Sequence, residues 1–209
     1  EILIGLVGSE MCIRDRWDIV QSGELGKVQI ITMNFGSFKE YDMSNRFFNM
    51  NLAGGAMLDI GVYALSIVRS FLDEQPDEIV SQWKPSPTGS DEQATILLKN
   101  AQGQMATVAL SMHSKQPKRA MISLEKGYIE IMEYPRADKA VIVDAESGVQ
   151  TEITAGDTAD ALYYEMQDME QAVKSGDASA MQLAYSKDVM EIMTKLRKDW
   201  GMKYPGEAW

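Results

Sequence analysis

The sequence predicts an α+β domain in which a mostly antiparallel, open-faced sheet carries helices packed on one face. Three observations predict this fold class. Residues 77–153 contain a dense run of short strand-like segments separated by turn signals. An apolar helical segment precedes this run, and two amphipathic helical segments follow it. Runs of strands flanked by helices are typical of α+β domains, and strands this close in sequence pair mostly as antiparallel hairpins.

Three elements are expected before the strand run. Residues 27–35 alternate between two faces, with Val28 and Ile30 on one face and Ile31 on the other, which predicts a strand. Residues 37–53 are polar and aromatic, which indicates a long loop of the kind that often carries function. A helix is expected from about 55 to 72.

Seven further strands are expected, because apolar and β-branched residues alternate between turn signals such as Pro85-Ser86-Pro87 and Lys126-Gly127. Their predicted ranges are 77–84, 92–99, 104–113, 119–124, 128–132, 139–144 and 149–153.

Two amphipathic helices are expected to close the chain. In the first, the apolar residues recur at helical spacing and are Leu162, Met166, Met169 and Val173. In the second, Ser186 is a good N-cap residue. The apolar stripe that follows it consists of Val189, Ile192, Met193, Leu196 and Trp200.

Composition narrows the function classes. The 209 residues suffice for one good-sized domain, and 45% apolar with 24% charged residues is ordinary for a globular protein. The net charge of -11, with 20 scattered basic residues, argues against a nucleic-acid partner. A single Cys excludes an internal disulfide framework. One His together with one Cys leaves almost no soft metal site, so no metal is expected. No run of about 18 apolar residues occurs, so no membrane span is expected.

Residues 1–16, EILIGLVGSEMCIRDR, differ from the rest of the chain. They lack the three spaced glycines and the following helix of a dinucleotide-binding fingerprint. No basic region precedes their apolar part, which argues against a signal peptide. The string resembles a translated sequencing-adapter peptide. We therefore expect residues 1–16 to be non-native, residues 17–209 to form the domain, and the natural protein to continue further upstream.

The most informative pattern lies in the predicted helix at 55–72. Asp59 and Tyr63 are four residues apart and therefore share one helix face. Gly61 between them costs a helix about 1 kcal/mol relative to Ala, which is expected where something must approach the backbone closely. An acid and a phenol converging beside bare backbone predict a polar substrate site. The alternative is a buried helix whose Asp is an N-terminal charge and whose Tyr belongs to the core.

From about Trp17 to Glu207 the chain resembles the C-terminal domain of the glucose–fructose oxidoreductase / inositol dehydrogenase (Gfo/Idh/MocA) family. Four segments carry the resemblance, and the second is the most specific: SGELGKV at 22–28, LAGGAMLDIGVY at 52–63, EKGYI at 125–129 and GMKYPGE at 201–207. Many members have His where this chain has Tyr63, and a second Asp where it has Ser66. The Tyr version resembles the branch that contains aldose and dihydrodiol dehydrogenases.

The resemblance implies a function. Members transfer hydride between a nicotinamide cofactor and a sugar, polyol or dihydrodiol. This chain is then the substrate-binding and dimerisation domain of an NAD(P)-dependent oxidoreductase, without the Rossmann domain that binds most of the cofactor. Alone it is expected to be inactive, and to form a homodimer or higher homo-oligomer through its open sheet face. Cytoplasmic localisation is the default expectation.

The resemblance also assigns roles within the motif. Tyr63 is the general acid/base candidate, and Asp59 the acceptor that orients a substrate hydroxyl. Because a free phenol has a pKa of about 10, Tyr63 needs a nearby cation, which relatives usually supply as a Lys after the Rossmann domain. Arg46 in the preceding loop is a candidate substrate contact, or else a solvated loop residue. His113 is interpreted as structural.

Two alternatives stay open at this point. One is a stand-alone binding or oligomerisation module without catalysis, and the other is a cofactor-binding relative that has lost catalysis. The sequence selects neither the substrate nor NAD over NADP, because the residues that distinguish the two cofactors would lie in the Rossmann domain.

Overall fold

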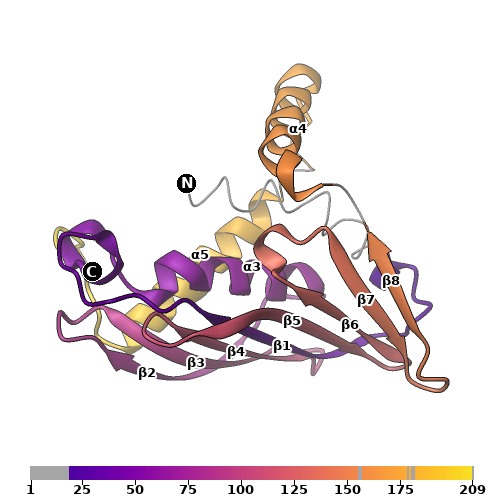
Figure 1. Ribbon diagram of the computed structural model, residues 1–209, viewed down its shortest axis with the longest axis horizontal. Coiled ribbons are helices and arrows are strands. Elements are labelled where there is room, and N and C mark those ends of the chain that lie inside the picture. The colour runs from indigo at the N-terminus through magenta and orange to yellow at the C-terminus, as the bar shows by residue number, and fades with distance from the viewer. Residues whose placement is uncertain (1–18, 155–156, 178, 180–181, 209) are drawn as a thin grey trace.

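The computed structural model describes residues 19–154, 157–177, 179 and 182–208 (Figure 1). The segment expected to be non-native, residues 1–16, lies outside the described residues.

Eight strands form a single sheet in the order β2-β3-β4-β1-β5-β6-β7-β8 (Figure 1). The central strands β1 and β4 run parallel, and every other neighbouring pair is antiparallel. The mostly antiparallel open sheet is therefore confirmed. The strands are β1 (Val28–Gly36), β2 (Glu78–Pro85), β3 (Asp91–Lys99), β4 (Met105–Ser111), β5 (Gln116–Leu124), β6 (Gly127–Met132), β7 (Lys139–Asp144) and β8 (Gln150–Thr154).

Helices cover one face of the sheet. A π-helical turn, η3 (Met57–Gly61), leads into α3 (Val62–Phe71), and α5 (Leu183–Asp199) lies beside α3 over the same face (Figure 1). Strand β3 shows the one-sided burial, because Ile96 and Leu98 are buried under the helices while Leu97 between them is 51% exposed. The core therefore lies between the sheet and these two helices. The described residues also form four 3-10 turns: η1 (Arg46–Phe48), η2 (Met50–Leu52), η4 (Tyr134–Arg136) and η5 (Thr158–Asp160).

Side-chain contacts hold α5 in place. The Arg69 guanidinium of α3 forms an ion pair with Asp188 of α5, with 2.7 Å between Nε and Oδ2. At the other end of α5, the Trp200 indole stacks on Trp83 of β2 with 5.2 Å between ring centroids, and its Nε1–H donates to Ser81 Oγ at 2.9 Å. The edge strand β2 is therefore fastened to the C-terminal helix.

The start of α5 differs from the prediction. The helix begins at Leu183, and Ser186 is a buried residue one turn inside it rather than an N-cap. The additional turn carries Tyr185, whose ring lies 4.4 Å from the Arg69 guanidinium carbon. This cation–π contact stabilises the additional turn and so accounts for the helical conformation of residues 183–185.

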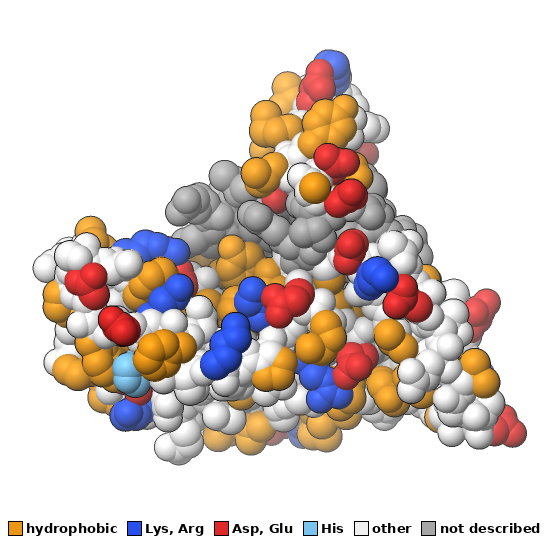
Figure 2. Space-filling view, in the orientation of Figure 1, with side chains coloured by type: hydrophobic (Ala, Val, Ile, Leu, Met, Phe, Trp, Pro, Cys, Tyr) orange, Lys and Arg blue, Asp and Glu red, His pale blue; other side chains and the backbone are white. Residues whose placement is uncertain are grey.

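Helix α4 (Ala161–Ser175) projects away from the sheet instead of packing on it (Figure 1). The apolar stripe that its sequence predicts is present but exposed, and apolar side chains gather on the projecting helix (Figure 2). The exposed fractions of Leu162, Met166, Met169 and Val173 lie between 47% and 75%. Within the described part of the chain, this stripe has no covering surface.

One described segment, Met50–Phe71, is long and apolar enough by composition to cross a membrane. Of its most apolar 18-residue window, 67% is buried inside the protein. This burial is what a core helix requires, and it accounts for the apolar composition.

We predict that Leu65→Ala, which truncates a fully buried side chain of α3, lowers the free energy of unfolding by about 2–5 kcal/mol. The matched change on the uncovered face, Leu97→Ala, should cost less than about 1 kcal/mol. Urea denaturation at a concentration where the chain is monomeric measures both values. Equal losses would contradict a one-sided core.

Candidate functional site

The helix that carries Asp59 and Tyr63 starts with an unusual turn. In η3 the Val62 N–H donates to Met57 O, an i→i+5 bond that makes this turn π-helical, and α3 continues from it. Asp59 lies in the π turn and Tyr63 in the first turn of α3. Isolated π turns inside helices occur frequently at functional sites.

Two glycines shape the approach to this helix. A Cβ on Gly54 would lie only 2.3 Å from Arg46 O, so only glycine lets the η1 backbone pack here. Gly55 N–H then donates to Phe47 O at 2.9 Å. These contacts fix η1 beside the start of the site helix and bring Arg46 near Asp59.

Asp59 and Tyr63 line one pocket of about 540 Å³, as their spacing predicts. The walls come from strands β1, β5 and β6, the loop after β1, the turns η1 and η3, helix α3 and the η4 region. The charged lining residues are Lys39, Arg46, Lys118, Asp59, Glu133 and Asp138. The three cations and three carboxylates balance, so the pocket offers hydrogen-bond donors and acceptors without a strong net charge.

Arg46 and Asp59 form an ion pair inside this pocket. The Asp59 side chain is 12% exposed, whereas the Arg46 side chain is 55% exposed. Phe47 supports the basic side, because Lys39 Nζ lies 4.3 Å and the Arg46 guanidinium carbon 5.2 Å from its ring centroid. Arg46, the predicted substrate contact, therefore holds the carboxylate of Asp59, which is predicted to orient the substrate.

The Tyr63 ring is held by aromatic packing. Its centroid lies 6.3 Å from that of Phe35, which in turn meets Tyr134 edge-on at 5.9 Å. Lys118 Nζ lies 5.4 Å from the Phe35 centroid and forms an ion pair of 2.9 Å with Glu133. Among the contacts of the described residues, none is a hydrogen bond to the Tyr63 hydroxyl, which leaves that group available to a ligand.

The loop that brings Lys39 and Arg46 to the pocket is anchored at its start. His113 Nδ1 lies 2.8 Å from Lys39 O, and since a carbonyl only accepts, Nδ1 carries the proton. The imidazole also stacks on Tyr41, with 4.3 Å between centroids. His113 therefore has a structural contact, as expected, although it lies just beyond β4 rather than within a strand.

A buried carboxylate completes this anchor. The Tyr41 hydroxyl donates to Glu92, and Lys84 Nζ lies 2.8 Å from the other Glu92 oxygen. Burial opposes ionisation of Glu92, but the bonds from Lys84 and Tyr41 outweigh it and lower the pKa of the carboxyl. The hydrogen bond to Glu92 in turn raises the pKa of Tyr41 to about 12, with burial adding to the shift.

Gly61 makes room for packing inside the protein and not for a ligand. It is buried, and a Cβ there would lie 2.9 Å from Leu110 Cδ1 and 3.0 Å from Met57 Sδ. What approaches the backbone is therefore the side chain of β4 under the helix, and not a ligand in the pocket.

Four charged residues of the pocket carry no signal in the sequence: Lys39, Lys118, Glu133 and Asp138. Lys39 lies in the long loop that the sequence indicates as functional, so the pattern predicts its region but not the residue. The other three come from strand β5 and the segment between β6 and β7, and only the pairing of these strands brings them to β1.

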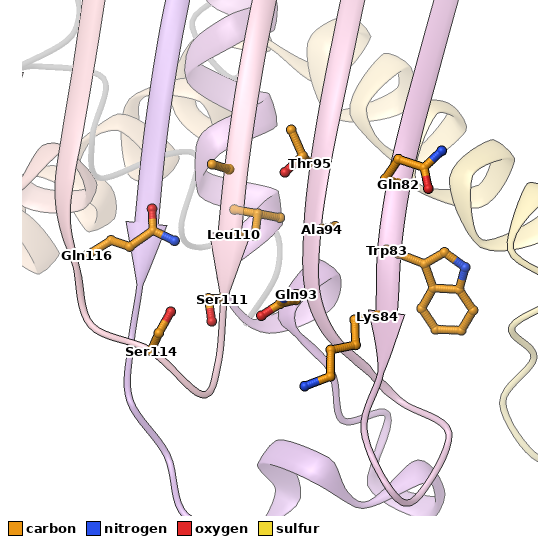
Figure 3. Close-up of a pocket in the computed structure, with 11 residues that line it drawn as sticks. Gln82, Trp83, Lys84, Gln93, Ala94, Thr95, Leu110, Ser111, Ser114 and Gln116 are labelled. Atoms are coloured by element: carbon orange, nitrogen blue, oxygen red, sulfur yellow. The ribbon is translucent and has the colours of Figure 1, made fainter.

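A second hollow of about 280 Å³ lies on the uncovered face of the sheet (Figure 3). Amide and hydroxyl side chains from neighbouring strands line it, among them Gln82, Gln93, Thr95, Ser111 and Gln116. It has no carboxylate beside a phenol, so the Asp59–Tyr63 pocket is the candidate site. Among the described residues, no group of three or more His, Cys, Asp or Glu side chains is placed to hold a metal.

Comparison with known proteins agrees with this fold. The family described as the GFO/IDH/MocA C-terminal domain matches residues 14–130. The chain belongs to this family. Two relatives are trans-1,2-dihydrobenzene-1,2-diol dehydrogenases. The Mus musculus enzyme is 23% identical over 197 residues, covering 90% of this chain and 58% of the enzyme. The Xenopus laevis enzyme is 27% identical over 192 residues, covering 87% and 57%.

Solved structures share the fold at low sequence identity. An aldose–aldose oxidoreductase from Caulobacter crescentus, complexed with glycerol, has a TM-score of 0.75 at 18% identity and covers 92% of this chain and 61% of its own. A 3-ketoreductase from Actinomadura kijaniata, in complex with NADP and TDP-benzene, has a TM-score of 0.74 at 18% identity, with coverages of 90% and 58%. This chain thus spans less than two thirds of each of these relatives.

We predict that Arg46→Gln changes the free energy of unfolding by no more than about 1 kcal/mol, because the Arg46 side chain is more than half exposed. The matched change in the largely buried pair with Asp188, Arg69→Gln, should cost about 3–5 kcal/mol. Guanidinium denaturation of both variants provides the comparison. A loss for Arg46→Gln as large as that for Arg69→Gln would make the Arg46–Asp59 pair a structural feature.

Proposed function

We propose that this chain is the substrate-binding part of an NAD(P)-dependent oxidoreductase that transfers hydride between a nicotinamide cofactor and a CH–OH group of a sugar, polyol or dihydrodiol. The observation that carries the proposal is that Asp59 and Tyr63, a carboxylate and a phenol, line one pocket. The names of the relatives add support, because a diol dehydrogenase, a ketoreductase and an aldose oxidoreductase all act at a carbinol or carbonyl carbon.

The roles follow from the chemistry of alcohol oxidation. The carbinol carbon loses a hydride with its two electrons, and the hydroxyl oxygen loses a proton, which leaves a carbonyl. Tyr63 takes that proton, and returns one in the reverse reaction. Asp59 accepts a hydrogen bond from a substrate hydroxyl, while Arg46 holds Asp59 and donates toward the substrate. The balanced charge of the pocket favours a ligand rich in hydroxyl groups.

The cofactor would be bound mainly outside this domain. Within the part of the chain that the structure describes, the sheet has a single parallel pair and no glycine-rich turn from a strand into a phosphate-binding helix. A nicotinamide ring at the pocket would accept the hydride, and Tyr63, Asp59 and Arg46 would orient the substrate beneath it. We expect the chain by itself to bind ligand without turnover.

We also propose that the open sheet face joins two copies of the chain. Val80 of β2 and Leu97 of β3 face each other across the ladder and are 62% and 51% exposed. Met105 of β4, opposite Ile30 of β1, is 45% exposed on the same sheet. Contiguous exposed apolar side chains of this kind mark association surfaces.

The self-association proposal predicts that Leu97→Lys shifts the chain from dimer to monomer. Size-exclusion chromatography with light scattering measures the mass. Val173→Lys on exposed α4 is the matched control and should leave the dimer intact. A wild-type chain that is monomeric at about 100 µM, well above the dissociation constant of a stable dimer, would rule out this interface.

The ligand-binding part of the proposal is tested on the chain itself. We predict that polyols and vicinal diols, such as glucose and trans-1,2-cyclohexanediol, shift the NMR amide resonances of residues 59–63. Asp59→Asn should weaken this binding at least about tenfold, by the loss of a hydrogen bond to a charged group. Glu146→Gln, an exposed turn residue far along the chain, serves as the matched control.

Catalysis is tested on the complete protein encoded at the locus, by following absorbance at 340 nm with NAD⁺ or NADP⁺. Tyr63→Phe should lower kcat by about 10²–10⁴-fold, the usual contribution of a general acid/base. Unchanged turnover would remove Tyr63 from this role. A complete protein that binds hydroxylated ligands but never reduces the cofactor would favour the stand-alone module or the relative without catalysis.

A further inference from the structure

Three segments far apart in sequence meet where the site helix begins. They are the Gly54–Gly55 turn, the start of β3 at Asp91, and the C-terminal segment at Tyr204. None of these residues lines the Asp59–Tyr63 pocket. Their contacts nevertheless converge within five residues of Asp59.

Asp91 caps the site helix from another element. The first amides of a helix have no partner within the helix, and Ala56 at the N-cap position has no side chain that could supply one. The fully buried Asp91 carboxylate acts as the cap, because its Oδ2 accepts the Met57 N–H at 2.5 Å. Met57 is the first residue of the π turn, so this bond fixes the turn at its origin.

Gly55 is matched to this carboxylate. Its φ is +134°, and a Cβ there would lie 1.9 Å from Asp91 Oδ1. Among the described residues, that oxygen is buried and has no hydrogen-bond partner. The turn and the aspartate are therefore in direct contact, and any side chain at position 55 would push the carboxylate off the Met57 amide.

The C-terminal segment clamps the same turn. The Tyr204 hydroxyl donates to Gly54 O at 2.7 Å. Arg197 holds the segment in place through two bonds to the Glu207 carboxylate, at 3.2 and 2.7 Å, and its guanidinium carbon lies 4.8 Å from the Tyr204 ring centroid. The turn before Met57 is thus fixed on both sides.

We propose that Asp91 is a positioning residue: by holding the Met57 amide it selects the π-helical turn and thereby sets the direction of the Asp59 carboxylate relative to Tyr63. The proposal rests on the proposed function of that pair. A π turn holds one more residue than an α turn, so a helix that lost this turn would rotate Asp59 about its axis relative to Tyr63. Asp59 would then be displaced from Arg46 and from the substrate hydroxyl.

The ionisation of Asp91 provides a spectroscopic handle. Burial raises the pKa of its carboxyl to about 7, although the Met57 and Asp91 amides and the charge of Arg197 oppose the shift. The other groups nearby do not titrate in this range. Burial raises the pKa of Tyr204, and Arg197 lowers that of Glu207. The adjacent Glu92 is bound to Lys84 and Tyr41.

The buried Asp91 carboxyl makes the stability of the fold depend on pH. A free Asp has a pKa of about 3.9, so between about pH 4 and 7 the folded chain retains a proton that the unfolded chain has lost. Asp91 therefore makes the fold progressively less stable as the pH rises through this window, and its contribution is constant above it. Asp91→Asn removes this component of the pH dependence.

The test compares wild type, Asp91→Ala, Asp91→Asn and Glu92→Gln by NMR. Glu92 is the neighbouring buried acid of the same strand, yet it does not contact the site helix. In wild type we expect the Met57 amide proton to titrate with a midpoint near pH 7, and the resonances of residues 59–63 to follow with the same midpoint. Asp91→Ala removes the acceptor of the Met57 N–H, so it should abolish this titration and raise amide hydrogen exchange in 57–63 at least tenfold. Asp91→Asn should abolish the titration alone, because its side-chain oxygen can still accept the Met57 N–H. Glu92→Gln should change neither.

Two results would overturn the proposal. One is a Met57 amide whose chemical shift does not follow the titration of the Asp91 carboxyl in wild type, a measurement that needs no folded variant. The other is exchange in 57–63 that rises equally in Asp91→Ala and Glu92→Gln. Neither readout uses a substrate, so failure here is distinct from failure of the proposed function, which wild-type ligand binding decides. In the complete protein, the lost alignment should lower kcat of Asp91→Ala at least tenfold with a smaller change in KM.

Discussion

Gly61 lets the site helix lie so close to the sheet that its backbone contacts the Leu110 side chain of β4, and the rest of the site depends on that contact. The same helix carries Asp59 and Tyr63, which line the pocket together with residues of β1 and β5. The glycine pair 54–55 sets where this helix begins, since the η1 backbone and the Asp91 carboxylate occupy the space that side chains would need. The motif is therefore as much a packing motif as a chemical one.

The sequence predicted the elements well because each has a strong local signal. Alternation in residues 27–35 and 92–99 locates two strands to within about one residue, and the four-residue spacing of Asp59 and Tyr63 correctly places both in one pocket. The catalytic roles of these residues stay predictions. The prediction that Ser186 is an N-cap is wrong, because capping propensity is a local preference. The cation–π contact between Arg69 and Tyr185, which extends the helix beyond Ser186, is a tertiary contact.

Other features could not be read from the chain. The parallel pairing of β1 with β4 depends on which strands meet in space. The same holds for the pairing of β1 with β5 and of β5 with β6, which brings Lys118 and Glu133 to the pocket. Helix α4 has the same apolar periodicity as α5, so periodicity alone does not distinguish the covered helix from the exposed one. Asp91 gave no signal because its partner, the Met57 amide, is a backbone group of another element.

The position of β1 also bears on how the chain folds. β1 lies at the centre of the sheet between β4 and β5, both of which follow it by long stretches of sequence. During synthesis on the ribosome β1 emerges before the other strands of this sheet, and both of its edges stay unpaired until β2, β3 and then β4 and β5 have been made. Contacts between segments this far apart in sequence slow folding. Until those contacts form, the unpaired edges of β1 can pair with other chains. The central strand that organises the finished sheet is thus the segment of the nascent chain most in need of protection from aggregation.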